Sequence, residues 1–335
     1  MIIGAFDFAR RPFLIAEIGN NHEGDPVHAR ELVDAAIEAG ADAIKLQIID
    51  AEKLVNRTEA LRVAQLKGYR LSRDVMLELA VTTRAKGRLF GASVFDCASL
   101  SETADDLDFI KIASGDLTFD PLLRVAAGTG KPIILSTGMA SDNEIVHAVE
   151  IVRTTLPAGV ALGDHLALAH CVSLYPAPIE MAQLGAMGSL KRRFDVSVGF
   201  SDHTLGLEAA MIALGLGAQL IEKHFTIDKA RSSFRDHALS ADVSEFTRLA
   251  AIMRALPAIV ADKSEPLPDL ANANRARRSI VAARDLQSGH VLTMEDLDFV
   301  RPASGLAPTF TASLIGRTLG RSVTRHERIL REDIK

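Results

Sequence analysis

Short apolar runs alternate with longer amphipathic stretches along most of the chain. The runs are rich in Ile, Val, Leu and Phe, as in strands buried on both faces, and the stretches at 29–39, 72–86 and 143–155 have a helical pattern. The predicted strands span 13–18, 42–47, 88–94, 109–113, 132–137, 166–171, 196–200 and 219–224. Since parallel strands need crossovers of about a dozen residues, this order predicts an α/β fold, a (β/α)8 TIM barrel within residues 1–256.

Polar side chains gather where these strands end. In such a barrel the carboxyl ends of the strands share one face, and that face carries the catalytic groups. A single polar residue there is ordinary, but here every predicted strand delivers at least one. The residues concerned are Glu17, Lys45, Gln47, Ser93, Lys111, Ser114, Ser136, Thr137, His170, Ser173, Ser201, Asp202, His203, Glu222 and His224. The pattern predicts an active site on this face.

A second, smaller domain follows the barrel. The composition changes at 263–269 to a Pro-containing polar stretch of linker type, so we assign residues 257–275 to a linker and 276–335 to the small domain. Within that domain, residues 284–297 align without gaps on residues 321–334. Two similar half-units predict a small β-rich domain with pseudo-twofold symmetry.

Composition limits the class of protein. The chain has 48% hydrophobic residues, a formal net charge of −5 and two cysteines, Cys97 and Cys171, without a CxxC spacing. The cysteines indicate a reducing compartment rather than a disulfide framework. We expect a cytoplasmic protein, since no uncharged apolar run reaches membrane-spanning length. The scattered, slightly acidic charge gives no electrostatic footprint for nucleic acid.

Lys45 and Lys111 are candidates for binding a small, multiply charged anion. Lysine supplies a point charge, and the turns at 114–115 and 136–138 can add hydroxyl and backbone N–H groups. A phosphate or a carboxylate fits this set. Two alternatives for Lys45 are a Schiff base with a carbonyl substrate and a structural ion pair with Glu17.

His203 and His224 come from neighbouring strand ends and are candidate metal ligands. Neutral imidazoles from separate strands leave coordination positions for water and a substrate carbonyl, with Asp202 and Glu222 as supporting acids. Two histidines without cysteine favour Mn²⁺ or Mg²⁺ over structural zinc. The alternative is a pair of rim histidines hydrogen-bonded to the two acids.

Seven ordered motifs resemble those of the sialic acid synthase family, N-acetylneuraminate synthase and related nonulosonic acid synthases. They read IAEIGNNHEG at 15–24, AIKLQ at 43–47, FIKIASG at 109–115, PIILSTGM at 132–139, HC at 170–171 with YP at 175–176, GFSDHT at 199–204 and IEKHFT at 221–226. Residues 277–279, 296–297 and 301–302 resemble that family's antifreeze-like (SAF) domain. The match covers nearly the whole chain.

The resemblance implies a metal-dependent condensation of phosphoenolpyruvate with an open-chain N-acylated hexosamine, giving a nine-carbon 2-keto acid and phosphate. Glu17 and Glu222 would manage protons and water. Phosphoenolpyruvate would contact Lys45, Ser93, Lys111, Ser114, Ser136, Ser173 and Ser201, and His203 and His224 would bind Mn²⁺, with Mg²⁺ or Co²⁺ as substitutes. The sugar would be faced by Gln47, Asp116, Tyr175, Asp202 and Asp236, and by Arg301 from the partner subunit of a domain-swapped homodimer.

Several departures from the family pattern fall mostly on the sugar side. Asp116 and Ser173 stand where the family usually has Glu and Asn, residues 92–95 replace a Ser-Thr-Pro-Phe run, and Phe234-Arg235 replaces a Gly-Pro pair. N-acetylmannosamine and precursors of the legionaminic or pseudaminic type are therefore alternative sugars. Two competing hypotheses for the function are a metal-dependent aldolase or synthase that acts on a different aldose, and a non-catalytic sugar-binding relative.

Overall fold

The computed structural model describes residues 1–262 and 269–335, which fall into two compact units, Met1–Val260 and Ala261–Lys335. Helix α12 (Val243–Ile259) carries the larger unit past residue 256, where we expected the barrel domain to end. Within the expected linker 257–275, α13 (Leu270–Ala276) is helical, and residues 263–268 of the Pro-containing stretch lie outside the described residues. None of the described helices is long and apolar enough to cross a membrane.

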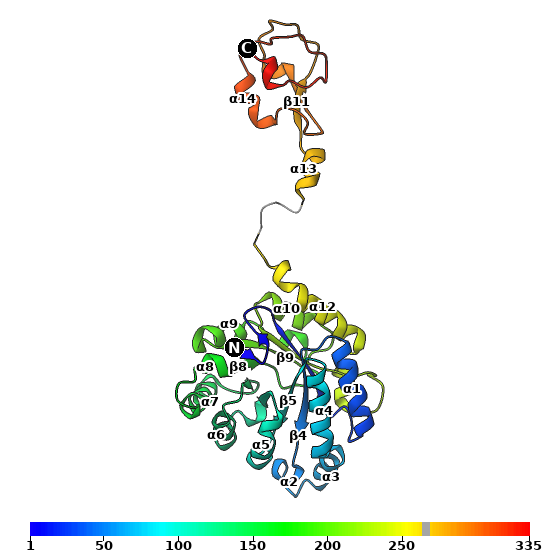
Figure 1. Ribbon diagram of the computed structural model, residues 1–335, viewed down its shortest axis with the longest axis vertical. Helices are drawn as coiled ribbons and strands as arrows, with labels where there is room; N and C mark the ends of the chain where they lie inside the picture. The colour runs from blue at the N-terminus through cyan, green and yellow to red at the C-terminus, as the bar shows by residue number, and fades with distance from the viewer. Residues whose placement is uncertain (263–268) are drawn as a thin grey trace. The chain divides into compact units, whose positions relative to one another are not determined.

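The larger unit is a closed barrel of parallel strands surrounded by helices, as the sequence predicts (Figure 1). Its eight strands are β3 (Phe13–Gly19), β4 (Ala43–Ile48), β5 (Leu89–Val94), β6 (Phe109–Ile112), β7 (Ile133–Ser136), β8 (Leu166–His170), β9 (Ser197–Asp202) and β10 (Leu220–His224). Each strand coincides with one apolar run, and β10 pairs with both β9 and β3 to close the barrel. The predicted fold class is confirmed.

Helices cover the outer face of the barrel, and side-chain caps fix where several of them begin. The helices are α1 (Pro26–Glu38), α2 (Ala51–Leu54), α3 (Ala60–Tyr69), α4 (Arg73–Ala85), α5 (Cys97–Thr103), α6 (Asp120–Gly128), α7 (Asp142–Thr155), α8 (Leu162–His165), α9 (Ala186–Phe194), α10 (Glu208–Gly215), α11 (Arg235–Leu239) and α12. Asp25, Ser72, Ser141 and Asp242 accept backbone hydrogen bonds from the first turns of α1, α4, α7 and α12. Helices α2 and α3 form an additional excursion between β4 and α4.

Apolar side chains fill the barrel at the end opposite to the carboxyl ends of the strands. The short strands β1 (Ile2–Ile3) and β2 (Phe6–Asp7) pair with each other, and residues around them pack on Phe13 and Phe109 inside the barrel. Gly91 makes room for this packing, since a Cβ atom there would overlap the Phe109 ring. Because this end is filled, the space for ligands lies at the carboxyl ends.

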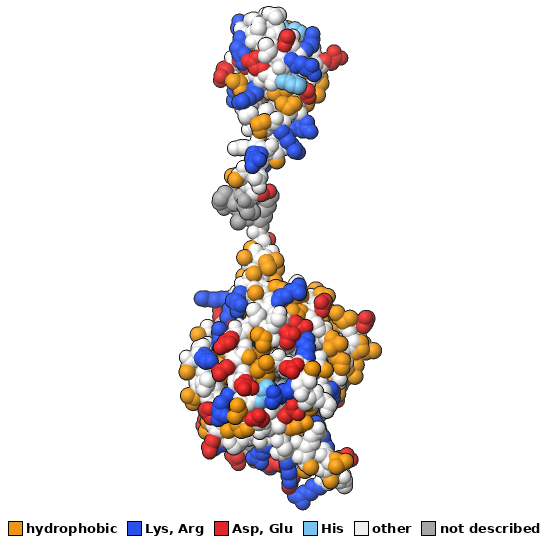
Figure 2. Space-filling view, turned by 90° about the vertical axis from the view of Figure 1, so that its right-hand side faces the viewer, with side chains coloured by type: hydrophobic (Ala, Val, Ile, Leu, Met, Phe, Trp, Pro, Cys, Tyr) orange, Lys and Arg blue, Asp and Glu red, His pale blue; other side chains and the backbone are white. Residues whose placement is uncertain are grey.

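Charged side chains of both signs are interspersed on the face of the larger unit that Figure 2 shows. Across the larger unit, many charged side chains form ion pairs between neighbouring elements, such as Arg30 with Glu78 from α4 and Arg84 with Asp108. Exposed pairs of this kind contribute little to stability. This face shows the scattered charge that the sequence indicates.

The smaller unit contains two half-units that pair with each other, as the internal repeat predicts. Its regular elements are α13, β11 (Ser279–Ala282), β12 (Leu297–Val300) and α14 (Thr311–Leu314). Leu286 and Val323, which occupy equivalent positions of the repeat, exchange two backbone hydrogen bonds of 2.9 Å. The equivalent arginines Arg284 and Arg321 each form an ion pair with the aspartate twelve residues further on.

Candidate active site

A cavity of about 560 Å³ opens at the carboxyl ends of the barrel strands. This volume suits a small-molecule site. Side chains alternate between the two faces of a strand, so that Lys45 and Gln47 of β4 both point inward and reach the cavity. Among the predicted site residues, the cavity is lined by Glu17, Lys45, Gln47, Ser93, Lys111, Ser114, Ser136, Tyr175, Ser201, His203, Glu222, His224 and Asp236. One cavity thus collects residues from all eight strand ends or the loops that follow them.

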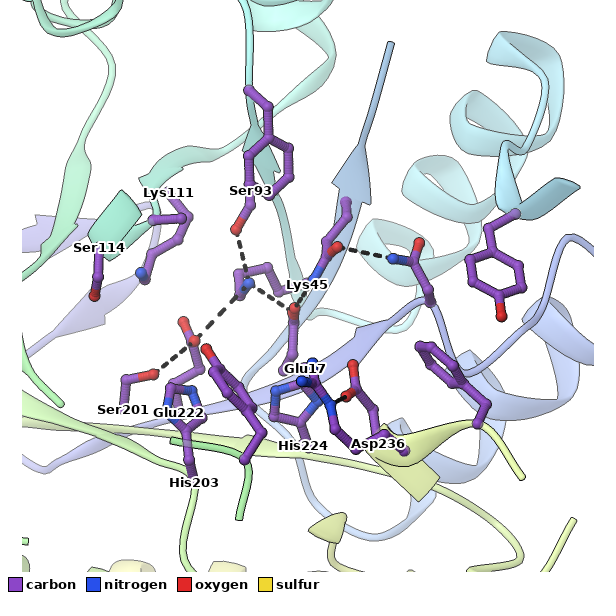
Figure 3. Close-up of a pocket in the computed structure, with 18 of the residues that line it drawn as sticks. Glu17, Lys45, Ser93, Lys111, Ser114, Ser201, His203, Glu222, His224 and Asp236 are labelled. Atoms are coloured by element: carbon purple, nitrogen blue, oxygen red, sulfur yellow. Dashed lines mark hydrogen bonds and ion pairs between the residues drawn. The ribbon is translucent and has the colours of Figure 1, made fainter. Parts of the chain in front are cut away.

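Lys45 lies at the centre of a buried polar cluster in this cavity (Figure 3). Its Nζ lies 2.6 Å from Oε2 of Glu17 and 3.9 Å from Oε1 of Glu222, and it donates a hydrogen bond of 2.9 Å to Oγ of Ser93. The Oγ of Ser201 donates to Oε1 of Glu222 at 3.0 Å. Neighbouring strands of the barrel therefore supply one connected network around a single ammonium group.

Lys111 provides a second buried amine on the opposite side of Glu222. It donates to Oγ of Ser136 and, at 3.1 Å, to the carbonyl oxygen of Ile112. Burial lowers the pKa of Lys111 from its ordinary value, and the carboxylate of Glu222 opposes that shift. Two amines with short hydroxyl side chains around them can bind a multiply charged anion.

The two carboxyl groups beside Lys45 have pKa values shifted in opposite directions. Burial raises the pKa of Glu17 to about 7, although Lys45 opposes the shift. Burial also raises the pKa of Glu222, but Lys45 and Lys111 together outweigh this effect and lower it to about 2. At neutral pH, Glu222 is therefore ionised while Glu17 exchanges a proton. Carboxyl pairs of this kind divide acid and base roles between them.

His203 and His224 lie side by side, with ring centroids 5.8 Å apart. The Nδ1 of His203 lies 2.9 Å from the carbonyl oxygen of Val172, which can only accept, so Nδ1 carries the proton and Nε2 keeps its lone pair. The Nδ1 of His224 is buried and has no hydrogen-bond partner among the described residues. Burial lowers the pKa of both imidazoles, which keeps them neutral at pH 7.

These two imidazoles fit a divalent metal ion. Neutral imidazole is the ligating form, and a hydrogen bond from the far ring nitrogen to a carbonyl is the usual support for a metal-binding histidine. Within residues 1–262 and 269–335, no group of three or more His, Cys, Asp or Glu side chains could hold a metal. A bound ion would therefore have two protein nitrogens and open positions for water and substrate.

The comparisons with known proteins agree with this fold. The sequence pattern of the NeuB family matches residues 32–265, and that of the SAF domain matches residues 277–335. The chain belongs to the NeuB family. It is 36% identical over 339 residues to the N,N'-diacetyllegionaminic acid synthase of Legionella pneumophila, covering 96% of this chain and 94% of that protein.

Two further relatives are named for other sugar acids. The chain is 30% identical over 352 residues to the pseudaminic acid synthase of Campylobacter jejuni, covering 100% of both proteins. A crystal structure of the N-acetylneuraminic acid synthetase of Leptospira borgpetersenii in complex with citrate has a TM-score of 0.70 and 32% identity, covering 78% of this chain and 89% of that chain. Three different sugar acids are named among these relatives, so family membership does not fix the sugar.

The structure corrects the placement of Asp202. We expected this residue to face the sugar, but its carboxylate is completely buried and pairs with Nζ of Lys223 at 2.8 Å. Strand β9 continues to Asp202, two residues beyond its predicted end, and side chains alternate along a strand. Ser201 therefore points into the cavity, and Asp202 points to the other face, where Lys223 of the neighbouring strand lies beside it.

Five other predicted residues, Asp116, Thr137, His170, Ser173 and Arg301, are not among those that line the cavity. Asp116 lies in the short 3-10 helix Ser114–Asp116, and burial raises the pKa of its carboxyl to about 6. This side chain is one methylene shorter than the glutamate that the family pattern has there. Ser173 lines a neighbouring cavity together with His170 and Met139, and Arg301 belongs to the smaller unit.

Several residues that line the cavity were not predicted from the sequence. Helix α3 contributes Arg62, Gln65 and Tyr69, the segment before α11 contributes Ser233 and Phe234, and α11 contributes its first residue, Arg235. Asn20, Glu23, Phe95, Ala113 and Cys171 complete the lining. The Arg235 guanidinium lies 4.7 Å from the centre of the Tyr175 ring and forms an ion pair with Asp236 at 3.2 Å. Phe234-Arg235 departs from the family pattern, and this could have indicated that both residues line the cavity.

Proposed function

We propose that this NeuB family chain condenses phosphoenolpyruvate with an open-chain N-acylated hexosamine to give a sialic-acid-like nine-carbon 2-keto acid and phosphate. The observation that carries the proposal is the single cavity in which two buried lysines face two neutral histidines. The lysines suit an anionic donor and the histidines suit a metal that activates an aldehyde. The chain is a phosphoenolpyruvate-dependent synthase that forms a carbon–carbon bond.

In this proposal phosphoenolpyruvate occupies the anion site. Lys45 and Lys111 bind its phosphate and carboxylate as point charges, and hydroxyl groups complete the hydrogen bonding. These hydroxyls belong to Ser93, Ser114, Ser136 and Ser201, which line the same cavity. Ser114 is held in place because its Oγ accepts a hydrogen bond of 3.1 Å from the backbone N–H of Gly138.

His203 and His224 would hold Mn²⁺, or Mg²⁺ or Co²⁺ in its place. When bound, such an ion polarises the aldehyde carbonyl of the sugar. The Val172 carbonyl fixes the ring of His203 through Nδ1, so that Nε2 is the atom available for a metal. Tyr175 limits access to this side, since its ring centre lies 4.2 Å from that of His203.

Glu17 and Glu222 would manage the protons of the reaction. The enol carbon of phosphoenolpyruvate bonds to the aldehyde carbon, water adds to the cationic carbon that bore the phosphate, and the bond from that carbon to the phosphate oxygen breaks. The attacking water loses both of its protons, because its oxygen becomes the keto oxygen. One proton reaches the aldehyde oxygen, which becomes a hydroxyl group, and the other leaves with the phosphate. We assign the donor role to Glu17, whose pKa is near 7, and stabilisation of the cation to the ionised Glu222.

The sugar would occupy the outer part of the cavity, against Gln47, Tyr175 and Asp236. We propose a domain-swapped homodimer in which Arg301 from the small domain of the partner binds the acyl group. We also propose a cytoplasmic location, because Cys97 and Cys171 are both free thiols. Candidate sugars are N-acetylmannosamine and precursors of the legionaminic and pseudaminic type.

The test is a screen of free hexosamines with phosphoenolpyruvate and Mn²⁺. A substrate should release inorganic phosphate in a one-to-one ratio with a new keto acid detected by mass spectrometry. Bridging ¹⁸O in phosphoenolpyruvate should appear in the released phosphate, because the carbon–oxygen bond breaks. A keto acid formed without phosphate release would identify an aldolase instead, and the proposal would be wrong.

A further inference from the structure

Three neighbouring strand ends of the barrel meet at the hydroxyl group of Ser114. Ser114 follows β6, and its Oγ accepts a hydrogen bond of 3.1 Å from the backbone N–H of Gly138, which follows β7. The Sγ of Cys171, the first residue after β8, lies 3.0 Å from the same Oγ. Both Ser114 and Cys171 line the active-site cavity, and the thiol of Cys171 is free. The reaction steps proposed for this chain give Cys171 no role.

The absence of a side chain at Gly138 lets these groups approach each other. A Cβ atom there would overlap the side chains of Ser114, Cys171 and Ser173. The Oγ of Ser173 is buried and makes no hydrogen bond within residues 1–262 and 269–335, so it does not compete for the Ser114 hydroxyl. Cys171 is itself buried. Close packing around Gly138 therefore holds the thiol against the hydroxyl.

The lone pairs and the proton of the Ser114 hydroxyl decide which way it points. A serine hydroxyl has one proton to donate and two lone pairs that accept, while a thiol is a weak donor or a weak acceptor. The N–H of Gly138 fills one lone pair. If Cys171 donates its S–H to the other, the Ser114 proton is left to point into the cavity. If Ser114 donates to the sulfur instead, a lone pair of its oxygen faces the cavity.

An anion in the cavity favours the first of these arrangements. Ser114 extends from the same strand end as Lys111 (Figure 3), and both line the cavity in which the anion would bind. A hydroxyl that donates to an anionic oxygen forms a bond about twice as strong as a neutral one, whereas sulfur is a weak acceptor. A lone pair turned toward the anion would repel it. The stronger bond therefore requires the thiol to donate to Ser114.

We propose that Cys171 is a positioning residue, which donates its S–H to Oγ of Ser114 and thereby directs the Ser114 proton toward bound phosphoenolpyruvate. The inference rests on the proposed function and extends it to a residue that needs no contact with the substrate. With both lone pairs occupied, by Gly138 and by the thiol, the Ser114 hydroxyl has no acceptor role left. It serves only as a donor to the anion.

The test is a double-mutant cycle on Ser114 and Cys171, in which calorimetry measures the affinity of the full-length protein for phosphoenolpyruvate with Mn²⁺ present. Ser114→Ala should weaken binding about 10- to 100-fold, since it removes a hydrogen bond to a charged group. Cys171→Ala should weaken it about threefold to tenfold, whereas Cys171→Ser keeps a donor and should stay within about twofold. The double variant Ser114→Ala/Cys171→Ala should bind as Ser114→Ala does, because the thiol then has no hydroxyl to orient.

Cys97→Ala is the matched control, since Cys97 begins α5 and lies outside the cavity lining. It should leave the affinity for phosphoenolpyruvate unchanged, and it makes Cys171 the only cysteine of the chain. With phosphoenolpyruvate bound, the infrared S–H stretching band of Cys97→Ala should lie at a lower frequency than that of Cys97→Ala/Ser114→Ala. Donation to an oxygen weakens the S–H bond, so this shift reports the thiol as the donor.

The inference is overturned if Cys171→Ala binds phosphoenolpyruvate as tightly as the unaltered protein, if Cys171→Ser binds as weakly as Cys171→Ala, or if the S–H band has the same frequency with and without Ser114. It is also overturned if the two losses add in the double variant, because the thiol would then contact the substrate directly. Failure of the proposed function is a different result. In that case the unaltered protein itself binds no phosphoenolpyruvate.

Discussion

The ammonium group of Lys45 lies 2.6 Å from a carboxylate oxygen of Glu17, and both side chains are almost completely buried. The amine also lies 3.9 Å from Glu222, so a single lysine is shared by two acids. Glu222 is the more strongly acidic of the two because Lys111 also acts on it. Because the two acids share one lysine, Glu17 is the acid that gains and loses its proton near neutral pH.

This relationship predicts the pH dependence of the reaction. The pKa of Glu17 is raised to about 7, so the proton-donating form is present below pH 7 and is lost as the pH rises through that value. We expect kcat/KM for phosphoenolpyruvate to fall above pH 7, because this ratio reports the ionisation of the free enzyme. Glu17→Gln should lower kcat by about 10²–10⁴-fold and remove the inflection, while the KM for phosphoenolpyruvate changes little. An inflection near pH 7 that persists in Glu17→Gln would assign it to another group.

Removal of the metal should stop the reaction. Treatment with a chelator should abolish turnover, and added Mn²⁺ should restore it. His203→Ala and His224→Ala should each lose both turnover and Mn²⁺ binding measured by calorimetry, yet unfold within a few degrees of the unaltered protein, because residues at the carboxyl ends of barrel strands contribute little to the core. A normal rate in the chelated protein would exclude a metal-dependent mechanism.

Lys111→Met should lower kcat/KM for phosphoenolpyruvate far more than kcat/KM for the sugar. Loss of a buried charged contact to the substrate costs about 2–4 kcal/mol in kcat/KM for phosphoenolpyruvate. Lys131→Met is the matched control, since Lys131 donates to the carbonyl of Leu107 and lies outside the cavity lining. Lys45→Met should resemble Lys111→Met. If borohydride trapped a covalent adduct of Lys45, Schiff-base chemistry would replace the ion-pair interpretation.

Asp202→Asn should lower the free energy of unfolding and leave the KM for the sugar unchanged. The substitution leaves the ammonium of Lys223 buried beside a neutral amide, and breaking a buried ion pair costs about 3–5 kcal/mol. Urea unfolding should show this loss, while the KM values for both substrates stay unchanged at a temperature where the variant is folded. A raised KM for the sugar without loss of stability would return Asp202 to the sugar site.

A mixture of two inactive variants should regain activity if Arg301 acts on the partner subunit. In a heterodimer of Arg301→Ala and Lys111→Met chains, one site receives both an intact lysine and an intact arginine. We expect recovery after subunit exchange, up to about half the specific activity of a heterodimer with two intact sites. Exchange can be followed with differently tagged chains. If exchange is complete and the mixture stays inactive, Arg301 acts within its own chain or has no role.

The barrel could be predicted because each of its strands coincides with a short, mostly apolar run, and because parallel strands bring their carboxyl ends together. The same reasoning places Lys45, Lys111 and Glu222 in one site from the sequence alone. The same reasoning fails at Asp202, because the predicted strand ends at residue 200, two residues too early. Asp202 is therefore predicted to be a loop residue, although it is part of β9 and its side chain faces outward. Strand periodicity can be applied only when the end of the strand is known.

Helix α3 could not be found from the sequence for a different reason. Only Leu66 of its ten residues is buried, so it lacks the apolar stripe by which an amphipathic helix is recognised. Its contribution to the cavity through Tyr69 depends on a tertiary contact with Phe234, 165 positions further along the chain. In the small domain the reverse holds, because the internal repeat already indicates that Arg284 and Arg321 have equivalent partners.

The positions of the two tyrosines make the intrinsic fluorescence of this protein a probe of ligand binding. The chain has two tyrosines and no tryptophan, and Tyr69 and Tyr175 both line the active-site cavity. Tyrosine fluorescence therefore originates entirely from the walls of the binding site, with one emitter at the end of α3 and the other beside His203. Arrival of a ligand can be followed without any label, and a phenylalanine at either position tells which wall the ligand has reached.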